Sequence, residues 1–490
     1  MRIYIVIACL LVWCDLLSQE QLGMRLENYA GVSSLALNPA NNLTNPLNWD
    51  ISLASAAVFL ENNYAFVRNT NTIDFLKNVS TYDFFSAPDV EGRTPKDAFV
   101  VDYVNDKRKR HGIGIINIMG PSVAFRLKEI HSVGFFINYR AIASTQAINN
   151  NFSFYNYNQP GGIPPFKIKP FEGALVSWRE FGLNYAVKLP TLQGSLGLGI
   201  NLRYLQGFEG AFFENASTNQ HQRFNRFSFV SSRVDARFGF TTTNLNGDNF
   251  HLQKNGSGFA LDLGATYIVE GDRENYLWKI GASILDLGSI RFNKNVQSHV
   301  VRADSSTLVD GTSYETLTSL EDLPLAAQIF SFQILGDSSA SLQQGGFKVL
   351  LPTALSLQGD YSFTDNFYLN ATLVQRIPMS GVAAERGNLF ALTPRFEHRW
   401  FAASLPFVLF NWQDFRMGAA LRLAFFVIGS DNIGSFFGHS DLSGTDLYAA
   451  VKINPFDLGI HLGGKKHNYD GGKKPVRGKR KRRKAHCYDF

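Results

Sequence analysis

Apolar and polar residues alternate with a period of two along much of the chain. The alternation is clearest in residues 181–187, 196–204, 259–267, 355–363 and 367–373, where large apolar side chains alternate with small or polar ones. This is the period of a β-strand with one apolar face. In a soluble sandwich that face would contact a second sheet. In a transmembrane barrel it would contact lipid, and Asn, Arg, Gln and Asp would line a polar interior.

The lengths of the connections favour the barrel, because short turns on one side alternate with long loops on the other. We place strands at 50–60, 110–127, 131–145, 174–189, 194–208, 222–230, 233–242, 256–270, 275–292, 347–363, 366–379, 389–404, 413–428 and 444–454. The expected short turns are 128–130, 190–193, 231–232, 271–274 and 364–366. The expected long connections are 61–109, 146–173, 209–221, 243–255, 293–346 and 430–443.

This pattern predicts an all-β protein, a transmembrane antiparallel β-barrel of 14 strands. Counts of 12 or 16 are also compatible, because boundaries read from sequence carry errors of about two to four residues. The weakest part is 209–255, where the order of turns and loops holds only if 224–230 and 233–242 form a short hairpin. A soluble domain would instead need unstructured loops of about fifty residues, which argues against it.

The first residues have the order of a secretory signal peptide. Arg2 supplies a positive charge, 3–13 is an apolar run, and Ser18 is a small residue at the expected cleavage site. The run is too short to span a bilayer well. We therefore expect a signal peptide at 1–18, with a buried N-terminal element as the alternative. Trp13 argues against a lipoprotein cysteine at the next position.

Composition agrees with an exported barrel without deciding for it. The chain has 490 residues, of which 42 are Phe and 18 are Tyr but only 5 are Met and 3 are Cys. Its mean hydropathy of −0.09 does not fit a helical membrane protein. After cleavage only Cys487 would remain, which leaves no disulfide framework and no cysteine-based metal site.

Residues 19–49 precede the first expected strand and are too polar to form one. They contain the turn Asn38, Pro39 and Ala40, in which proline fixes its own φ and restricts the residue before it. A barrel of this size leaves a lumen unless something fills it. We expect this segment to form a hatch inside the barrel, with a flexible periplasmic leader as the alternative.

The Asn-Pro-Ala turn ahead of the first strand resembles the hatch of FadL/PorV-like outer-membrane barrels. Residues 258–264 followed by 280–288 resemble a hairpin common in the PorV-like Bacteroidetes branch. Residues 429–433 followed by 444–448 resemble the closing strands of uncharacterised Bacteroidetes barrels of that kind. The even number of strands and the alternation of short and long connections place the barrel at 50–455, with both chain ends in the periplasm. Members of these groups differ in role, since some pass hydrophobic molecules and others are subunits of a secretion machine.

Residues 456–490 form a strongly basic tail. From residue 464 onward eleven Lys or Arg residues stand against Asp470 and Asp489, whereas the whole chain carries a net charge of +6. The tail could be solvated without a partner, bind anionic material, or dock onto an acidic periplasmic subunit. The residues predicted to bind a partner or anion are Lys473, Lys474, Arg477, Lys479, Arg480, Lys481, Arg482, Arg483 and Lys484.

No catalytic pattern accompanies these features. The sequence has no phosphate-binding loop, zinc-binding His-Glu-x-x-His motif or nucleophile elbow, and we expect no enzyme, cofactor, metal or nucleic acid partner. Two non-enzymatic functions remain, beside the alternative of a barrel enzyme that carries His, Ser or Asp on its strands. The favoured one is an accessory subunit of an outer-membrane secretion or assembly complex, in contact with lipid and with other outer-membrane or periplasmic subunits. The alternative is a channel for a hydrophobic ligand.

Overall fold

The computed structural model describes residues 20–453, except 91–95, 153–163, 224–227, 247–249, 272–275, 315, 318 and 439. The described residues belong to one compact unit. The expected signal peptide (1–18) and the basic tail (456–490) lie outside them. Among the described helices, none combines the length and the apolar character that a membrane crossing requires.

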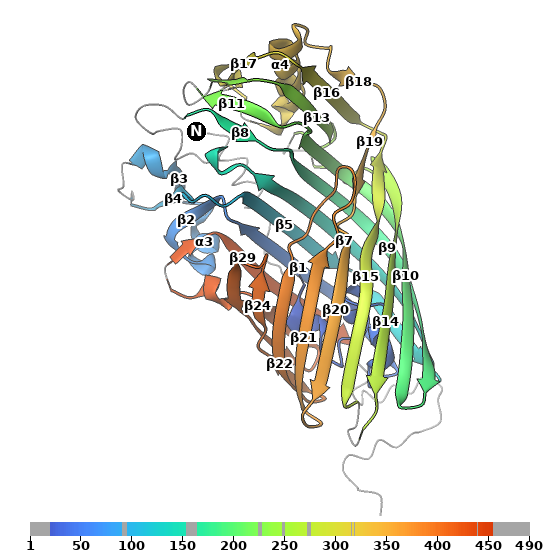
Figure 1. Ribbon diagram of the computed structural model, residues 1–490. Helices are drawn as coiled ribbons and strands as arrows, with labels where there is room; N and C mark the ends of the chain where they lie inside the picture. The colour runs from blue at the N-terminus through green and yellow to red at the C-terminus, as the bar shows by residue number, and fades with distance from the viewer. Residues whose placement is uncertain are drawn as a thin grey trace, which may run out of the picture. The chain divides into compact units, whose positions relative to one another are not determined.

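The described residues form a closed antiparallel β-barrel of 14 strands, which confirms the predicted fold class (Figure 1). The sheet closes because the first strand pairs with the last, from Ile51 opposite Ile453 to Glu61 opposite Gly444. Short breaks divide four strands into two segments each: β5 and β6, β19 and β20, β23 and β24, β25 and β26.

The wall segments are β1 (Trp49–Asn62), β5 (Arg110–Met119), β6 (Ser122–Leu127), β7 (His131–Ile148), β9 (Phe171–Thr191), β10 (Gly194–Asn215), β14 (Gly256–Val269), β15 (Trp278–Phe292), β19 (Phe347–Leu350), β20 (Ala354–Ser362), β21 (Phe367–Arg376), β22 (Leu389–Glu397), β23 (Phe401–Ser404), β24 (Phe407–Phe410), β25 (Asp414–Met417), β26 (Ala419–Leu423), β27 (Phe426–Ser430) and β29 (Gly444–Ile453). The chain enters β1 and leaves β29 at the same end of the barrel, here called the terminal rim. The opposite end is the loop rim.

The predicted number of strands is right, but two of the predicted strands are wrong. The expected strands 222–230 and 233–242 are not among the 14, and each of 389–404 and 413–428 contains two strands with a turn between them. The missed turns at 398–400 and 424–425 contain neither glycine nor proline, and Ala424 takes a φ of 51°. The sequence therefore gave no turn signal there.

The long connections fold into structure beyond the loop rim instead of remaining irregular. One small sheet contains β2 (Ala65–Thr70), β3 (Asp83–Ser86), β4 (Ala98–Tyr103) and β28 (Ser440–Leu442), and another contains β8 (Phe166–Ile168), β11 (Asn219–Arg223), β12 (Ser228–Ser231) and β17 (Thr307–Asp310). The segments β13 (Val234–Thr241), β16 (Val296–Ala303) and β18 (Leu342–Gln343) extend the barrel sheet. The helices here are α3 (Thr72–Asn78), α4 (Leu323–Leu335), η3 (Ala87–Val90), η4 (Asn150–Phe152), η7 (Gly311–Tyr314), η8 (Leu320–Asp322) and η9 (Ile433–Phe436).

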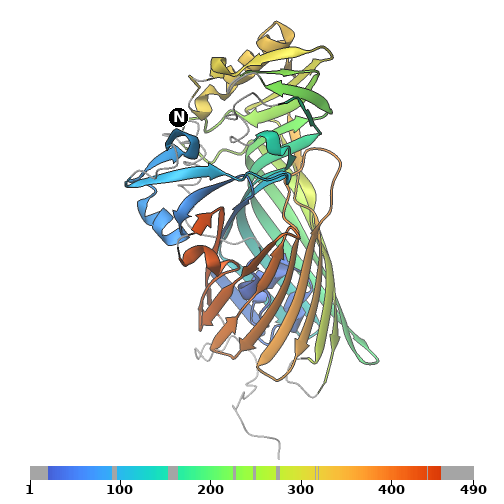
Figure 2. The same ribbon diagram turned by 60° about the vertical axis from the view of Figure 1, so that its left-hand side comes forward.

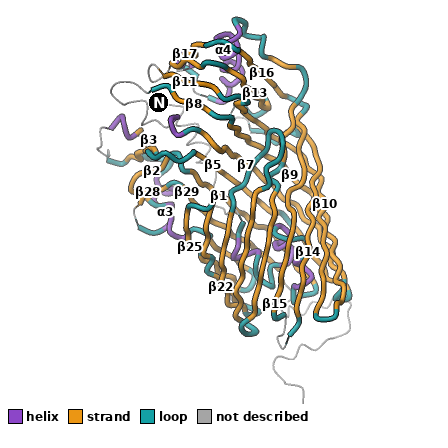
Figure 3. Tube along the Cα trace, viewed as in Figure 1, coloured by secondary structure: helices purple, strands orange, loops and turns teal. Residues whose placement is uncertain are grey.

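The N-terminal segment lies inside the barrel near the terminal rim (Figures 2 and 3). It forms three short helices, α2 (Leu22–Arg25), η1 (Gly31–Ala36) and η2 (Asn41–Thr44). Nearly all of residues 20–45 are buried, and their large apolar side chains join hydrophobic clusters with the wall, namely Leu22, Met24, Leu26, Val32, Leu35, Leu37 and Leu43. We call residues 20–48 the plug.

The outer surface of the wall is apolar, as the alternation predicts for a surface that contacts lipid. Leu183 and Leu202 are exposed on the outside, whereas their neighbours Asn184 and Arg203 are buried inside. Other exposed apolar residues of the wall are Phe125, Phe135, Leu198, Phe259, Leu263, Ile280, Leu287, Leu357, Leu392, Leu421, Leu423, Phe426 and Ile428.

We predict that Leu202→Arg destabilises the barrel by about 2–4 kcal/mol, because a cation on the lipid face near the bilayer centre is costly. Gln206→Arg, two outward positions closer to the loop rim on the same strand, should change the stability by less than about 1 kcal/mol. Urea unfolding in phospholipid vesicles measures both. Equal losses would show that Leu202 does not face the hydrocarbon.

Candidate functional site

Hydrogen bonds between the wall and the plug, made by the plug's backbone and short polar side chains, hold the plug in place. The Asn38 side chain donates to the Ala265 carbonyl oxygen at 3.0 Å and accepts from the Ala40 amide at 2.9 Å. Asn184 of β9 donates to the Pro39 carbonyl at 3.0 Å, and Ser283 of β15 donates to the Leu37 carbonyl at 2.6 Å. Such bonds are required because buried backbone groups need partners.

Two inward-facing glycines make space for this turn. A Cβ at Gly199 of β10 would lie 2.5 Å from the backbone nitrogen of Ala40. A Cβ at Gly264 of β14 would lie 2.2 Å from the Asn38 side-chain oxygen. The predicted hatch residues Asn38, Pro39 and Ala40 therefore lie buried against strands that carry glycine where the plug approaches most closely.

Buried ion pairs bind the other side of the plug. Glu27 pairs with Arg422 of β26 at 2.6 Å. Lys452 of β29 pairs with Asp50 at 3.0 Å and donates to the Tyr29 and Ala30 carbonyls. These contacts join the two ends of the barrel chain to the same plug segment.

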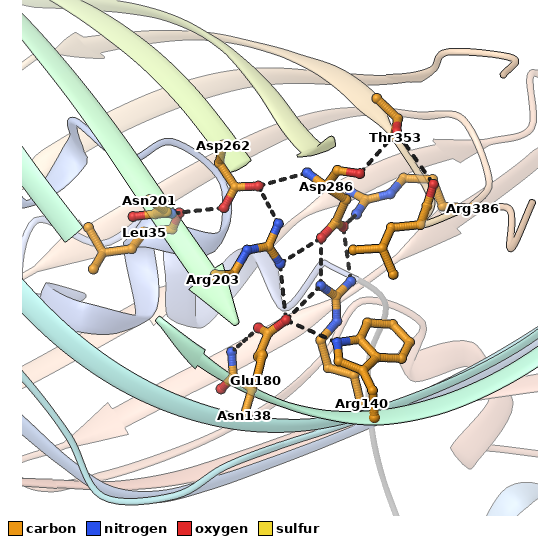
Figure 4. Close-up of polar contacts among 12 residues, drawn as sticks. Leu35, Asn138, Arg140, Glu180, Asn201, Arg203, Asp262, Asp286, Thr353 and Arg386 are labelled. Carbon is orange, nitrogen blue, oxygen red and sulfur yellow. Dashed lines mark hydrogen bonds and ion pairs between the residues drawn. The ribbon is translucent and has the colours of Figure 1, made fainter. Parts of the chain in front are cut away.

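A charged network centred on Asp286 lies deeper in the lumen (Figure 4). Arg140 of β7 donates to both Asp286 carboxylate oxygens, at 2.7 and 3.0 Å. Arg203 of β10 donates to Asp286 at 2.8 Å and to Asp262 at 2.5 Å, and Arg386 also pairs with Asp286. A single carboxylate thus contacts three guanidinium groups.

A β-bulge places Asp286 in this position. The register of β14 against β15 shifts between Leu261 and Leu263, so that Leu285 and Asp286 both turn inward, with φ of 55° at Asp286. The neighbouring strand is also interrupted there, between β19 and β20, where Thr353 donates to the Asp286 carbonyl at 3.0 Å. Bulges commonly re-aim a side chain in this way.

The remaining members of the network connect the wall to the plug. Glu180 of β9 accepts from Arg203, from Trp178 at 3.1 Å and from Asn138 at 2.8 Å. Asn201 of β10 donates to Asp262 at 2.9 Å and to the Leu35 carbonyl of the plug at 3.1 Å. Charged residues from several strands therefore pair with one another inside the lumen, and Asn201 connects them to the plug.

The connection between β21 and β22 also reaches into the lumen. Its Arg386 is 6% exposed and contacts both Asp286 of the wall and Glu20 of the plug, the latter at 3.2 Å. Val382 and Ala384 of the same connection bond to the backbone of Leu350 in β19. This segment therefore joins the plug to the wall inside the lumen.

The interior changes character along the barrel axis. On β7, β9, β10, β14 and β15 the inward charged residue is followed, toward the loop rim, by inward apolar residues. Buried apolar residues of this layer include Phe59, Ile113, Ile142, Val176, Trp178, Leu205, Ala260, Ile290, Phe292, Val349, Val374, Leu389, Ala391 and Phe410. We call them the apolar layer. The expectation of a polar interior is therefore wrong for the half of the lumen near the loop rim.

A cavity of about 50 Å³ lies between the two layers. Leu35, Phe136 and Leu285 line its apolar side, and Arg25 and Asp262 are among its charged lining residues. It holds at most a few water molecules.

The structure describes only some of the site residues that were predicted from the sequence. The hatch residues are buried in the lumen, whereas the nine basic tail residues from Lys473 to Lys484 lie outside the described residues. Sequence reasoning missed the Asp286 network. Charged residues at inward positions of alternating strands, such as Arg140, Arg203 and Asp262, were the available signal. Within the described part of the chain, no group of three or more His, Cys, Asp or Glu residues could hold a metal ion.

The model of a family described as a family of unknown function, DUF5723, matches residues 57–431. The chain belongs to the DUF5723 family. The match covers most of the wall of this DUF5723 protein but not the plug. No curated protein matches the sequence.

Three similar solved structures are barrels with low identity. The toluene transporter TbuX of Ralstonia pickettii is 9% identical, with 87% of this chain and 94% of that chain covered and a TM-score of 0.37. The CymD monoaromatic hydrocarbon channel is 9% identical, with 89% and 97% covered and a TM-score of 0.31. A Pseudomonas aeruginosa FadL homologue is 9% identical, with 86% and 92% covered and a TM-score of 0.22. Scores this low support no inference about function, and the resemblance to Bacteroidetes barrels remains a prediction.

We predict that Gly199→Val displaces the plug, because its side chain would overlap the backbone at Pro39 and Ala40. Trypsin should then cleave after the normally buried Arg25, detected by mass spectrometry. Gly359→Val on β20 is the matched control, since a Cβ there has nothing within 4 Å. Protection of Arg25 in both variants would contradict this account of the turn.

Asp286→Asn should destabilise the barrel by about 3–5 kcal/mol, because it leaves three buried guanidinium groups without their shared carboxylate. Asp235→Asn removes a carboxylate whose partner Arg302 is 68% exposed, so its cost should stay below about 1 kcal/mol. Urea unfolding in vesicles compares the two. Similar midpoints would mean that the network contributes little to stability.

Proposed function

We propose that this DUF5723 protein is a non-enzymatic outer-membrane channel for hydrophobic small molecules, closed by its plug in the present state. The observation that carries the proposal is the apolar layer, which surrounds the lumen on the loop side of the charged network. A water-filled pore would not need such a layer. Placement in the outer membrane is supported by the apolar outer surface of a closed barrel.

The plug and the connection 377–388 would act as the two closures of this channel. Both meet at Arg386, which contacts Glu20 of the plug and Asp286 of the wall. Opening would therefore require these buried ion pairs to exchange partners. The small cavity beside the network marks where the apolar and polar layers meet.

This proposal replaces the subunit of a secretion complex as the favoured function. The main argument for a subunit was the basic tail, which lies outside the described residues. The apolar layer serves passage of a hydrophobic ligand, whereas a scaffold would need only a filled lumen. A role in a complex stays an outcome of the test below.

The test measures uptake of radiolabelled toluene and of a long-chain fatty acid by host cells that express the protein in their outer membrane. Val374→Thr places a hydroxyl in the apolar layer at nearly constant volume and should lower uptake by about threefold or more. Val187→Thr makes the same change on the lipid face and should leave uptake within about twofold of wild type.

Expression without any gain in uptake over empty cells would overturn the channel. Purification in mild detergent, full-length and truncated after Gly463, separates the alternatives further. A stoichiometric set of protein partners that is lost on truncation would favour the function as a subunit of a secretion complex. It would also show that the tail docks onto those partners. Recovery of the barrel alone, together with uptake, supports the channel.

A further inference from the structure

A row of polar and basic side chains crosses the outer face of five neighbouring strands. Strand register places Arg179 of β9 opposite Gln206 of β10, Gln206 opposite Ser257 of β14, Ser257 opposite Arg291 of β15, and Arg291 opposite Lys348 of β19. Arg179, Ser257, Arg291 and Lys348 are exposed. At about 4.8 Å between strands, the row spans roughly 19 Å of the wall.

A fourth cation joins the row from the residues before β14. The Lys254 amino group donates to the Tyr204 hydroxyl at 2.7 Å and lies 5.4 Å from the centre of its ring. The Arg179 guanidinium is similarly held by Gln206 at 2.7 Å and by the Phe181 ring at 5.2 Å. We call Arg179, Lys254, Arg291 and Lys348 the basic row.

The charge of the basic row is not neutralised by the protein part that the structure describes. Arg203 and Arg386, inside the lumen, contact two or more carboxylates each. The four residues of the basic row make no ion pair with a described carboxylate. An anion from outside the protein is the natural partner for such a cluster.

The position of the basic row along the barrel axis indicates which anion this is. On β9, β10 and β14 the next outward residues toward the terminal rim are aromatic, namely Phe181, Tyr204 and Phe259. On β15 and β19 they are Ser289 and Leu350. The aromatic residues are followed by Leu183 and Leu202, which are 62% and 55% exposed. Aromatic residues mark the membrane interface and leucines the hydrocarbon, so the basic row lies at the level of the lipid headgroups.

The basic row is confined to one side of the barrel. On β24 and β25, outward residues near the loop rim are Phe407, Leu409, Phe415 and Met417, none of which is charged. A general attraction to the membrane surface would not need four cations gathered on one side of the barrel. The arrangement is that of a localised binding site.

We propose that the basic row binds the phosphorylated headgroup of a lipid in the leaflet around the loop rim. Arginine and lysine are the side chains that hold phosphate oxygens most effectively, and the acyl chains of the lipid would lie along Leu183 and Leu202. The site lies on the outside of the wall and does not depend on whether the lumen conducts. It would anchor this side of the barrel to a particular class of lipid.

Native mass spectrometry of the purified full-length protein in detergent tests the proposal, with diphosphoryl lipid A as the probe. We expect the wild-type protein to keep bound diphosphoryl lipid A through purification. The variant Arg179→Gln/Arg291→Gln/Lys348→Gln should bind this lipid at least about tenfold more weakly. A galactolipid without phosphate should bind both proteins weakly and equally. All three positions face outward, so the lumen contacts remain unchanged.

The matched control is Arg233→Gln/Arg237→Gln/Arg302→Gln, which removes the same charge from residues that pair with Asp304, Glu214 and Asp235. It should bind diphosphoryl lipid A within about twofold of wild type. Equal binding by the first variant and wild type, or an equal loss in the control, would overturn the site. Displacement of the lipid by millimolar inorganic phosphate would also overturn it, since a soluble anion would then be sufficient.

Discussion

The contact of one carboxylate, Asp286, with three guanidinium groups is the interaction on which the packing inside the lumen depends. Arg140 and Arg203 come from the wall and Arg386 comes from the connection 377–388. Buried charges are tolerated only when they are paired and hydrogen-bonded. Each of these elements must therefore occupy its observed position for the others to be stable. The bulge that turns Asp286 inward is the local feature that makes the arrangement possible.

The plug follows from the same constraint. A barrel of 14 strands is too wide for its own side chains to fill. The lumen therefore stays open unless a second segment of the chain enters it. The plug is buried through apolar side chains such as Leu22, Leu35 and Leu37 as well as through hydrogen bonds and ion pairs to the wall. Its carbonyl groups at Leu35, Leu37 and Pro39 all accept from wall side chains. Such a segment can leave the lumen only if many polar contacts are exchanged together.

The division of the lumen into two layers connects the fold to the proposed function. Toward the terminal rim, polar residues such as Asn184 and Asn201 donate hydrogen bonds to backbone carbonyl groups of the plug. Toward the loop rim, inward positions of the same strands are apolar, for example Val176 and Leu205. A hydrophobic molecule entering from the loop rim would find a compatible surface as far as the Asp286 network. The outer face shows a similar division, from the basic row to aromatic residues and then to leucines.

The sequence by itself determined the all-β class, the return of the chain to its starting rim and the Asn38–Ala40 turn, because these depend on local periodicity and local backbone restriction. It did not determine which segments form the wall. The turns at 398–400 and 424–425 lack glycine and proline, so two strands were missed while 222–230 and 233–242 were wrongly included. Only the tertiary structure decided the lumen. Arg140 and Asp286 are 146 residues apart and meet because the barrel closes, and closure depends on pairing between distant strands, which no local pattern records.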